Sequence, residues 1–219
     1  MKKFITIEGG EGVGKTLLIE GLVKEFTEKG ASFIQSYEPG GTPTADFLRQ
    51  LFKRPFKDDP LFPLAELFLV STARVQHIEG KLRPAVMSGK WIICDRYYDS
   101  TRVYQGILPG IPEEKVETVI KNSAFDFDPE VTLLLDCPTS VVLNRLKRRE
   151  NDHVNDGGED RPDRFDNADG IYHEKLRQAY LDVAGKFPHR IHVIDASGTP
   201  EGILREAINI IESKIGAIK

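Results

Sequence analysis

Short runs of consecutive apolar residues alternate along the chain with longer stretches in which apolar residues recur every three or four positions. The five runs cover residues 4–7, 32–36, 91–94, 131–135 and 191–194. A run that is apolar at every position, rather than at every second one, is typical of a strand buried on both faces. The pattern therefore predicts an α/β fold, with a five-stranded parallel sheet flanked by helices on both faces. We expect the run 91–94 to be the central strand.

The longer stretches predict helices, the main ones over residues 17–29, 63–89, 112–123, 139–149, 167–187 and 200–215. We expect the second of these to tolerate its late proline, Pro84. Residues 151–166 are polar and contain glycine, so they cannot bury enough apolar surface to become ordered alone. Such a segment between two helices is typical of a lid over a site. We expect one domain over residues 1–219, with the lid at about residues 148–166.

A glycine-rich loop follows the first apolar run and leads into the first helical pattern. Its residues are Gly9, Gly10, Glu11, Gly12, Val13, Gly14, Lys15 and Thr16. They match the P-loop pattern G-x-x-x-x-G-K-T, whose glycines turn backbone N–H groups toward a phosphate at a helix N-terminus. Lys15 would reach the β- and γ-phosphates, and Thr16 would offer its hydroxyl to Mg²⁺. The loop predicts binding of a nucleoside triphosphate.

Candidate partners of this loop follow other strands and helices. Ligands of a parallel sheet lie beyond the carboxyl ends of its strands, and there Asp95 is expected to be the second Mg²⁺ ligand. Arg49, Arg74 and Arg96 are expected at the same rim. A second basic group, Arg145, Arg148, Arg149, Arg161 and Arg164, flanks or occupies the predicted lid. Two basic clusters around one P-loop favour phosphoryl transfer between two anionic ligands, although a solvated charged face remains the alternative for the lid group.

Composition narrows the class of protein. Apolar residues make up 40% and charged residues 29% of the 219 positions, which is ordinary for a globular domain, and the net charge of −4 gives no electrostatic reason to expect nucleic acid. We expect no membrane partner, because no apolar run approaches the ~18–20 residues of a membrane span. Met1, Lys2 and Lys3 lead directly into the first apolar run, so we expect no signal peptide. Cys94 and Cys137 lack disulfide spacing, which favours a cytoplasmic location. We expect His77 to lie on a helix surface with no acid beside it.

Further motifs accompany the P-loop at specific spacings. They are E-P-G-G-T-P at residues 38–43 with Arg49 after it, S-T-A-R-V-Q-H at 71–77, D-R-Y-Y-D-S-T at 95–101, Y-Q-G at 104–106 and Y-H-E-K-L-R at 172–177. Together with Glu8 and the P-loop, they resemble the bacterial thymidylate kinase family over nearly the whole chain. The resemblance implies a P-loop NTPase fold, Mg²⁺-dependent transfer of the γ-phosphoryl group of ATP to dTMP, and a homodimer.

The resemblance also implies roles for individual residues of the acceptor side. Glu11 matches the acid that accepts a hydrogen bond from the deoxyribose 3′-hydroxyl, and Arg49 and Arg96 match ligands of the dTMP phosphate. Arg74 matches the donor to thymine O4. The remaining matches are Thr101 and Gln105, polar contacts to the base, and Tyr104, the ring that disfavours ribonucleotides. Val70 stands where the family usually places an aromatic ring against thymine, and Phe68 is expected to face away from that side of the helix.

On the donor side, Lys15 and Arg96 match catalytic residues, and Arg145 matches the guanidinium that lies on the adenine ring. The lid arginine that neutralises charge in the transition state corresponds to Arg148, Arg149 or Arg164. Three alternatives stay open: a deoxynucleoside kinase, another nucleoside monophosphate kinase on this fold, and a regulatory protein that binds ATP as a signal. The arginines expected on the acceptor side, and the lack of an N-K-x-D guanine motif, argue against a regulatory protein.

Overall fold

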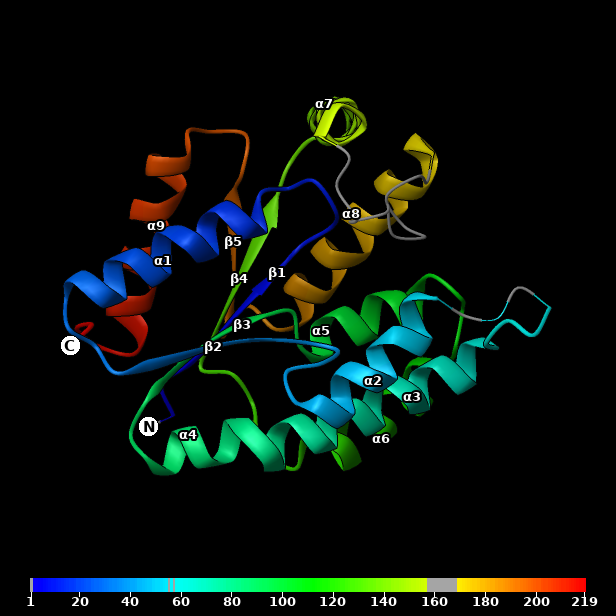
Figure 1. Ribbon diagram of the computed structural model, residues 1–219, viewed down its shortest axis with the longest axis horizontal. Helices are drawn as coiled ribbons and strands as arrows, with labels where there is room; N and C mark the ends of the chain where they lie inside the picture. Colours follow the sequence, from blue (N-terminus) through cyan, green and yellow to red (C-terminus); the bar gives the residue numbers. More distant parts are fainter. Residues whose placement is uncertain (1, 55, 57, 157–168) are drawn as a thin grey trace.

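The computed structural model describes residues 2–54, 56, 58–156 and 169–219, and its centre is a sheet of five parallel strands (Figure 1). The strands are β1 (Phe4–Glu8), β2 (Phe33–Tyr37), β3 (Trp91–Asp95), β4 (Val131–Asp136) and β5 (Ile191–Asp195). Every predicted run corresponds to a strand that ends one residue beyond the run, and β2 also begins one residue later than predicted. The predicted fold class is confirmed.

The central strand is β1, so the prediction that the run 91–94 lies at the centre is wrong. The strand order is β2-β3-β1-β4-β5, and β1 pairs with β3 on one side and with β4 on the other. The runs of β1 and β3 are similarly apolar, so their composition alone does not distinguish β1 from β3 as the middle strand. The strand order reverses at β1, which is the place where parallel sheets of this kind bind ligands. The loop that leaves β1 is therefore at the switch point of the sheet.

Successive residues of the inner strands are buried on opposite faces of the sheet, which explains their continuous hydrophobicity. Ile5 and Ile7 belong to one core cluster, together with residues of helices α1 (Lys15–Glu28) and α9 (Pro200–Lys214). Phe4 belongs to a second cluster, which contains residues of helix α3 (Pro63–His77). Figure 1 shows α1 and α9 together, away from α2, α3 and α6.

The other α-helices of the described residues are α2 (Pro43–Lys53), α4 (Arg83–Met87), α5 (Tyr98–Thr101), α6 (Glu113–Ala124), α7 (Thr139–Asp156) and α8 (Gly170–Lys186), and a π-helix, Arg102–Ile107, directly follows α5. The helix predicted over residues 63–89 is α3 and α4 joined by a π-helical turn, Ile78–Leu82. In a regular helix the ring of Pro84 would clash with the carbonyl group four residues earlier, and the wider turn just before it relieves that clash. None of the described helices combines the length and apolarity needed to cross a membrane.

Helix α7 continues through Asp156, so the prediction that it ends at residue 149 is wrong. The sequence from residue 148 to 156 is polar but contains neither glycine nor proline, and the first glycines come at 157 and 158. Polarity therefore did not prevent helix formation here, because no helix-breaking residue occurs before residue 157. The predicted lid thus begins as helix, and residues 157–168 lie outside the described part of the chain.

Candidate active site

The P-loop joins β1 to α1 through glycines whose backbone conformation other residues rarely adopt. Gly9, Gly12 and Gly14 have φ angles of 134°, 73° and 106°. A Cβ atom on Gly9 would also lie only 2.7 Å from the backbone oxygen of Leu135. Helix α1 then begins at Lys15, so its first N–H groups, which have no partners within the helix, face the loop. This geometry favours an anion at the N-terminus of α1.

Lys15 lies inside this loop. Its Nζ donates hydrogen bonds to the backbone oxygens of Gly9 and Gly10, at 3.0 and 2.7 Å. Burial and the positive charge of Arg96 lower the pKa of Lys15 to about 8. A phosphate beside the ammonium group would raise this pKa again, because an opposite charge favours the ionised form. Lys15 is therefore placed to respond to a bound anion.

One cavity of about 560 Å³ extends along the P-loop and the ends of β1 and β3. Most of the predicted site residues line it: Glu11, Gly12, Val13, Gly14, Lys15, Thr16, Arg49, Val70, Arg74, Asp95, Arg96, Thr101, Tyr104, Gln105, Arg145 and Arg149. Gly9 and Gly10 line a smaller cavity on the other side of the loop. The structure therefore brings Arg49, Arg74 and Arg96 to the same cavity as Arg145 and Arg149, two members of the second predicted basic group.

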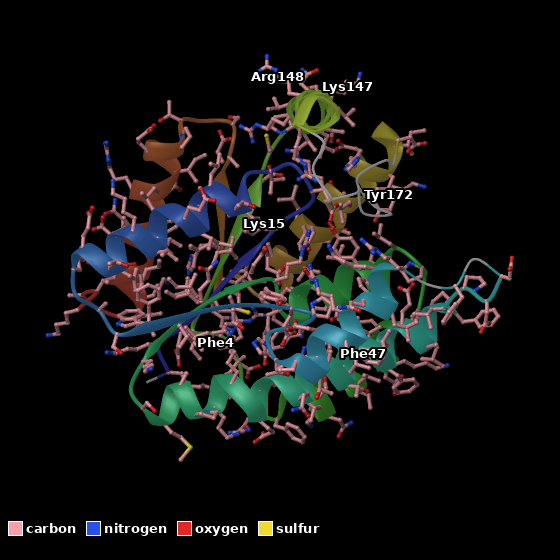
Figure 2. The ribbon with its side chains drawn as sticks, viewed as in Figure 1. Phe4, Lys15, Phe47, Lys147, Arg148 and Tyr172 are labelled. Atoms are coloured by element: carbon pink, nitrogen blue, oxygen red, sulfur yellow. The ribbon has the colours of Figure 1, made fainter. Side chains whose placement is uncertain are left out.

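The lid arginines differ in their positions. Arg149 lines the main cavity, whereas Arg148 is exposed on α7 and, in Figure 2, projects away from the sheet. Arg161 and Arg164 lie outside the described residues. In the part of the chain that the structure describes, Arg149 is thus the lid candidate nearest to the P-loop.

Glu11 and Arg96 form an ion pair at the cavity wall. Arg96 Nη2 donates to Glu11 Oε1 at 2.9 Å, and the hydroxyl of Tyr104 donates to the same oxygen at 2.6 Å. Burial acts to raise the pKa of Glu11, but the charges of Arg96 and Lys15 outweigh it and lower this pKa. Glu11 Oε2 is buried and accepts no hydrogen bond from the described residues. The carboxylate therefore has one oxygen left for a hydroxyl group in the cavity.

The side chain of Arg96 is held by three elements at once. Besides Glu11, it donates to the hydroxyl of Tyr180 on α8 at 2.7 Å and to the Ser100 hydroxyl on α5 at 3.2 Å. Ser100 in turn donates to Glu8 Oε2 at 2.7 Å, and burial, together with the charge of Asp99, raises the pKa of Glu8 to about 7. Arg96 has φ of 65°, which is strained for a residue with a side chain. This network therefore fixes the guanidinium group despite an unfavourable backbone conformation.

Glu8, Ser100 and Tyr180 are functional residues that the sequence motifs did not indicate. Glu8 directly follows the first apolar run, and Ser100 belongs to the motif at residues 95–101, so both had a detectable signal. Tyr180 had no such signal in the sequence, because α8, which carries it, is far from Arg96 along the chain. Only the fold brings its hydroxyl to Arg96.

Arg74 and Gln105 supply polar groups to another part of the cavity. Arg74 Nε donates to Glu38 Oε2 at 3.0 Å, and Nη2 donates to the Thr101 hydroxyl at 2.6 Å. Gln105 Nε2 is buried and donates no hydrogen bond to the described residues. Val70 lines the same cavity, whereas Phe68 is 54% exposed, so the prediction that Phe68 faces away is confirmed. The pocket therefore offers hydrogen-bonding groups beside an aliphatic wall.

His77 is fully buried, so the prediction that it lies on a helix surface is wrong. Its Nδ1 lies 3.0 Å from Glu38 Oε1, and its Nε2 lies 2.6 Å from the Ser36 hydroxyl. The prediction that no acid lies beside it is also wrong. His77 follows Arg74 by three residues and shares its buried helix face. The acid comes from the loop after β2, which α3 contacts only in the fold.

Arg145 closes the other end of the cavity. Its guanidinium group donates to the backbone oxygen of Val13 at 3.1 Å and to that of Ala196, just after β5, at 3.0 Å. These two hydrogen bonds, from Nη1 and Nη2, hold the planar guanidinium group between the P-loop and the end of β5. A fixed guanidinium plane is well suited to stacking on an aromatic ring.

Asp95 and Thr16 line the same cavity, and each has a side-chain oxygen that could ligate a metal ion. Asp95 Oδ1 is buried and has no hydrogen-bond partner among the described residues. A buried carboxylate oxygen without a partner is costly unless a cation or water satisfies it. Mg²⁺ prefers such oxygen ligands together with water and phosphate oxygens. The two residues therefore fit a magnesium ion.

Comparisons with known proteins agree with this geometry. The model of the thymidylate kinase family matches residues 7–208. The thymidylate kinase of Syntrophotalea carbinolica is 40% identical over 91% of this chain and 90% of its own length. That of Chlamydia trachomatis serovar D is 38% identical over 97% and 100%, and that of Chromohalobacter salexigens is 37% identical over 92% and 91%. The chain belongs to the thymidylate kinase family.

Proposed function

We propose that this chain transfers the γ-phosphoryl group of ATP to dTMP, giving dTDP and ADP, which is the reaction of its family. The observation that carries the proposal is the single cavity that contains both the P-loop and three further arginines, Arg49, Arg74 and Arg96. A hydrolase acting on ATP alone has no evident need for this second basic cluster. A transferase needs it, because it must offset the repulsion between two anionic substrates.

The P-loop and Lys15 would hold the β- and γ-phosphates of ATP, with adenine against the guanidinium group of Arg145. Thr16 and Asp95 would hold Mg²⁺, which would supply positive charge at the phosphates. The lid arginine would come from Arg149, the candidate that lines the cavity, from Arg148 after a change of conformation, or from Arg164, which lies outside the described residues. Within this assignment, residues 1–219 act as one domain with a lid at about 148–166.

Arg49 and Arg96 would bind the phosphate of dTMP, and the unpaired Oε2 of Glu11 would accept a hydrogen bond from the 3′-hydroxyl. Tyr104, fixed against Glu11, would crowd the 2′ position. Arg74 would donate to the base, as would the free amide nitrogen of Gln105, with Thr101 holding Arg74 in place. Catalysis would then consist of alignment and charge stabilisation, because phosphoryl transfer requires little covalent work from the protein.

An acceptor screen tests this function. ADP release from ATP and Mg²⁺ is measured with dTMP, dUMP, thymidine, dCMP and dGMP in turn. We expect dTMP to give the highest kcat/KM of the set. Phosphorylation of thymidine but not of dTMP would instead identify a deoxynucleoside kinase, and slow ATP hydrolysis that no acceptor changes would identify an ATP-binding regulator.

Phe52 is expected to contribute to dTMP binding, because Val70 cannot stack on the base. Phe52 is 8% exposed and lines the cavity from α2, three residues after Arg49. Loss of one base–aromatic contact costs about 1–3 kcal/mol, so Phe52→Ala should raise the KM for dTMP about 10-fold and leave the KM for ATP unchanged. Phe47→Ala is the matched control, since Phe47 lies on the same helix and is 71% exposed. Steady-state kinetics with each substrate varied would contradict the assignment if the two variants behaved alike.

We also propose that two copies of the chain associate through α3. Leu64 and Phe68, four residues apart on one helix face, are 45% and 54% exposed, and Phe62 beside them is 76% exposed. Exposed apolar side chains gathered on one face mark an interaction surface, and a single stripe can pair with its own copy about a two-fold axis. Phe68→Glu should therefore convert a dimer into a monomer, as measured by light scattering after size exclusion. The control Met87→Glu, on α4 and 82% exposed in the unmodified chain, should stay dimeric. A monomeric unmodified protein would contradict this proposal.

We place the reaction in the cytoplasm. Both cysteines of the chain, Cys94 and Cys137, are free and buried. Buried thiols without a disulfide are typical of a reducing compartment. Equal thermal stability with and without a thiol reductant would agree with this placement, whereas loss of stability on reduction would contradict it.

A further inference from the structure

Four buried side chains form a continuous hydrogen-bonded row behind the cavity. The hydroxyl of Ser36 on β2 lies 2.6 Å from His77 Nε2, and His77 Nδ1 lies 3.0 Å from Glu38 Oε1. The second oxygen of Glu38 accepts from Arg74 Nε at 3.0 Å. Each of the four residues is at most 4% exposed. The row thus connects the interior, through the loop after β2, to an arginine in the cavity wall.

The order serine, histidine, carboxylate is that of a hydrolase triad, but access rules out this role. Glu38 and Arg74 line the main cavity, whereas Ser36 and His77 line none of the cavities described above. Ser36 is 3% exposed and His77 is completely buried. A nucleophilic hydroxyl must reach its substrate. The row therefore acts on the cavity only through Glu38 and Arg74.

The hydrogen bonds in this row have a definite direction. The carboxylate of Glu38 can only accept, so the ring of His77 donates from Nδ1 and, in its neutral form, accepts the Ser36 hydroxyl at Nε2. Both oxygens of Glu38 are then engaged, one by His77 and one by Arg74. A carboxylate held at both oxygens cannot rotate away from the guanidinium group. His77 thereby sets the orientation in which Glu38 presents itself to Arg74.

The backbone around Glu38 also rests on His77. Gly41 has φ of 90°, and a Cβ atom on it would lie 2.5 Å from His77 Nε2. The loop is therefore packed directly against the imidazole ring. The same loop carries the Pro39 carbonyl oxygen, which accepts a hydrogen bond from Arg49 Nη1 at 2.8 Å. Displacement of the ring would consequently disturb both arginines of the acceptor side.

We propose that His77 is a positioning residue for acceptor recognition, which acts on the dTMP base through Glu38 and Arg74 without touching the substrate. The inference rests on the proposed function. It assigns to a buried histidine a specific effect on one of the two substrates. The P-loop and Arg145 lie outside this row, so ATP binding should not depend on it.

Two substitutions separate positioning from simple filling of space. In His77→Asn the amide nitrogen takes the place of Nδ1 and can still donate to Glu38. In His77→Gln the amide reaches the place of Nε2, beside Ser36, and the donor to Glu38 is lost. We expect His77→Gln to raise the KM for dTMP about 10-fold and His77→Asn to raise it no more than about 3-fold, with kcat and the KM for ATP within about 3-fold of the unmodified enzyme in both.

A role in packing alone would lower the Tm of both variants by similar amounts and leave the KM for dTMP unchanged, and this result would overturn the inference. If neither variant folds, Ser36→Ala decides, because it removes only the hydroxyl that orients the ring. It should raise the KM for dTMP about 2- to 5-fold without affecting the KM for ATP, and no change would count against the inference. Unmodified protein that does not phosphorylate dTMP would instead refute the proposed function itself.

Discussion

Replacing Lys15 by alanine should lower kcat for phosphorylation of dTMP by about 10³-fold, which corresponds to about 4 kcal/mol of transition-state stabilisation. The Lys15 ammonium group is buried against the P-loop and has a pKa lowered to about 8 by burial and by Arg96. The carboxylates of Asp95, Glu11 and Glu8 only partly offset these effects, and a bound phosphate would add a further opposite charge. Alanine removes the positive charge of the ammonium group from the place where the negatively charged phosphoryl group is transferred. Initial rates of ADP release at saturating ATP and dTMP measure the effect.

Lys24→Ala is the matched control for this experiment. Lys24 lies on the same helix, and its side chain is 76% exposed and reaches Glu28 only at 3.9 Å. An exposed pair of this kind contributes little, so kcat should stay within about 2-fold of the unmodified enzyme. If Lys15→Ala kept more than about a tenth of the activity, the loop would not be the place where the transferred phosphate is bound.

Arg96→Ala is expected to lower kcat/KM for dTMP by about 10²- to 10³-fold. The guanidinium group has three separate acceptors: Glu11, Ser100 and Tyr180. It is therefore fixed before any substrate arrives, and in the proposed complex it would face both the dTMP phosphate and the transferred group. Arg96→Lys should recover little of the loss, because a single ammonium group cannot reach three acceptors in fixed directions. The measurement is kcat/KM with dTMP varied at saturating ATP.

Arg83→Ala provides the control, since Arg83 pairs with Glu79 at the surface of α4. It should leave kcat/KM unchanged. Thermal unfolding must accompany the kinetics, because removal of Arg96 leaves Glu11 without its main charge partner. Full activity of Arg96→Ala with an unchanged Tm would show that the acceptor phosphate binds elsewhere.

Local features of the fold were predictable because each has a local cause. Runs rich in apolar residues predicted all five strands, of which β1, β3 and β4 are buried on both faces, and the spacing of the glycines predicted the P-loop. The order of strands was not predictable in the same way. It depends on which pairs of similar apolar runs meet, and β1 rather than β3 occupies the centre. Helix α7 extends beyond its predicted end, because a polar segment without glycine or proline can still form a helix.

In the candidate site, too, some features were predictable from the sequence and others depend on tertiary packing. Arg96 directly follows β3, and Arg49 and Arg74 lie on helices between β2 and β3, so their meeting at the carboxyl rim of the sheet could be anticipated. His77 and Tyr180 could not be placed, because their partners, Glu38 and Arg96, come from segments whose contacts only tertiary packing creates. Spacing within one helix reveals which residues share a face. It does not reveal what lies opposite that face.

We expect phosphate to pass directly from ATP to dTMP within the cavity formed by the P-loop and the acceptor arginines. This transfer is tested with ATP labelled at the γ-phosphate, Mg²⁺ and unlabelled dTMP, with separation of the labelled products. Direct transfer predicts that the label appears in dTDP at the same rate as ADP is formed, and that Lys15→Ala abolishes the transfer. Label recovered as inorganic phosphate at a rate independent of dTMP would contradict it.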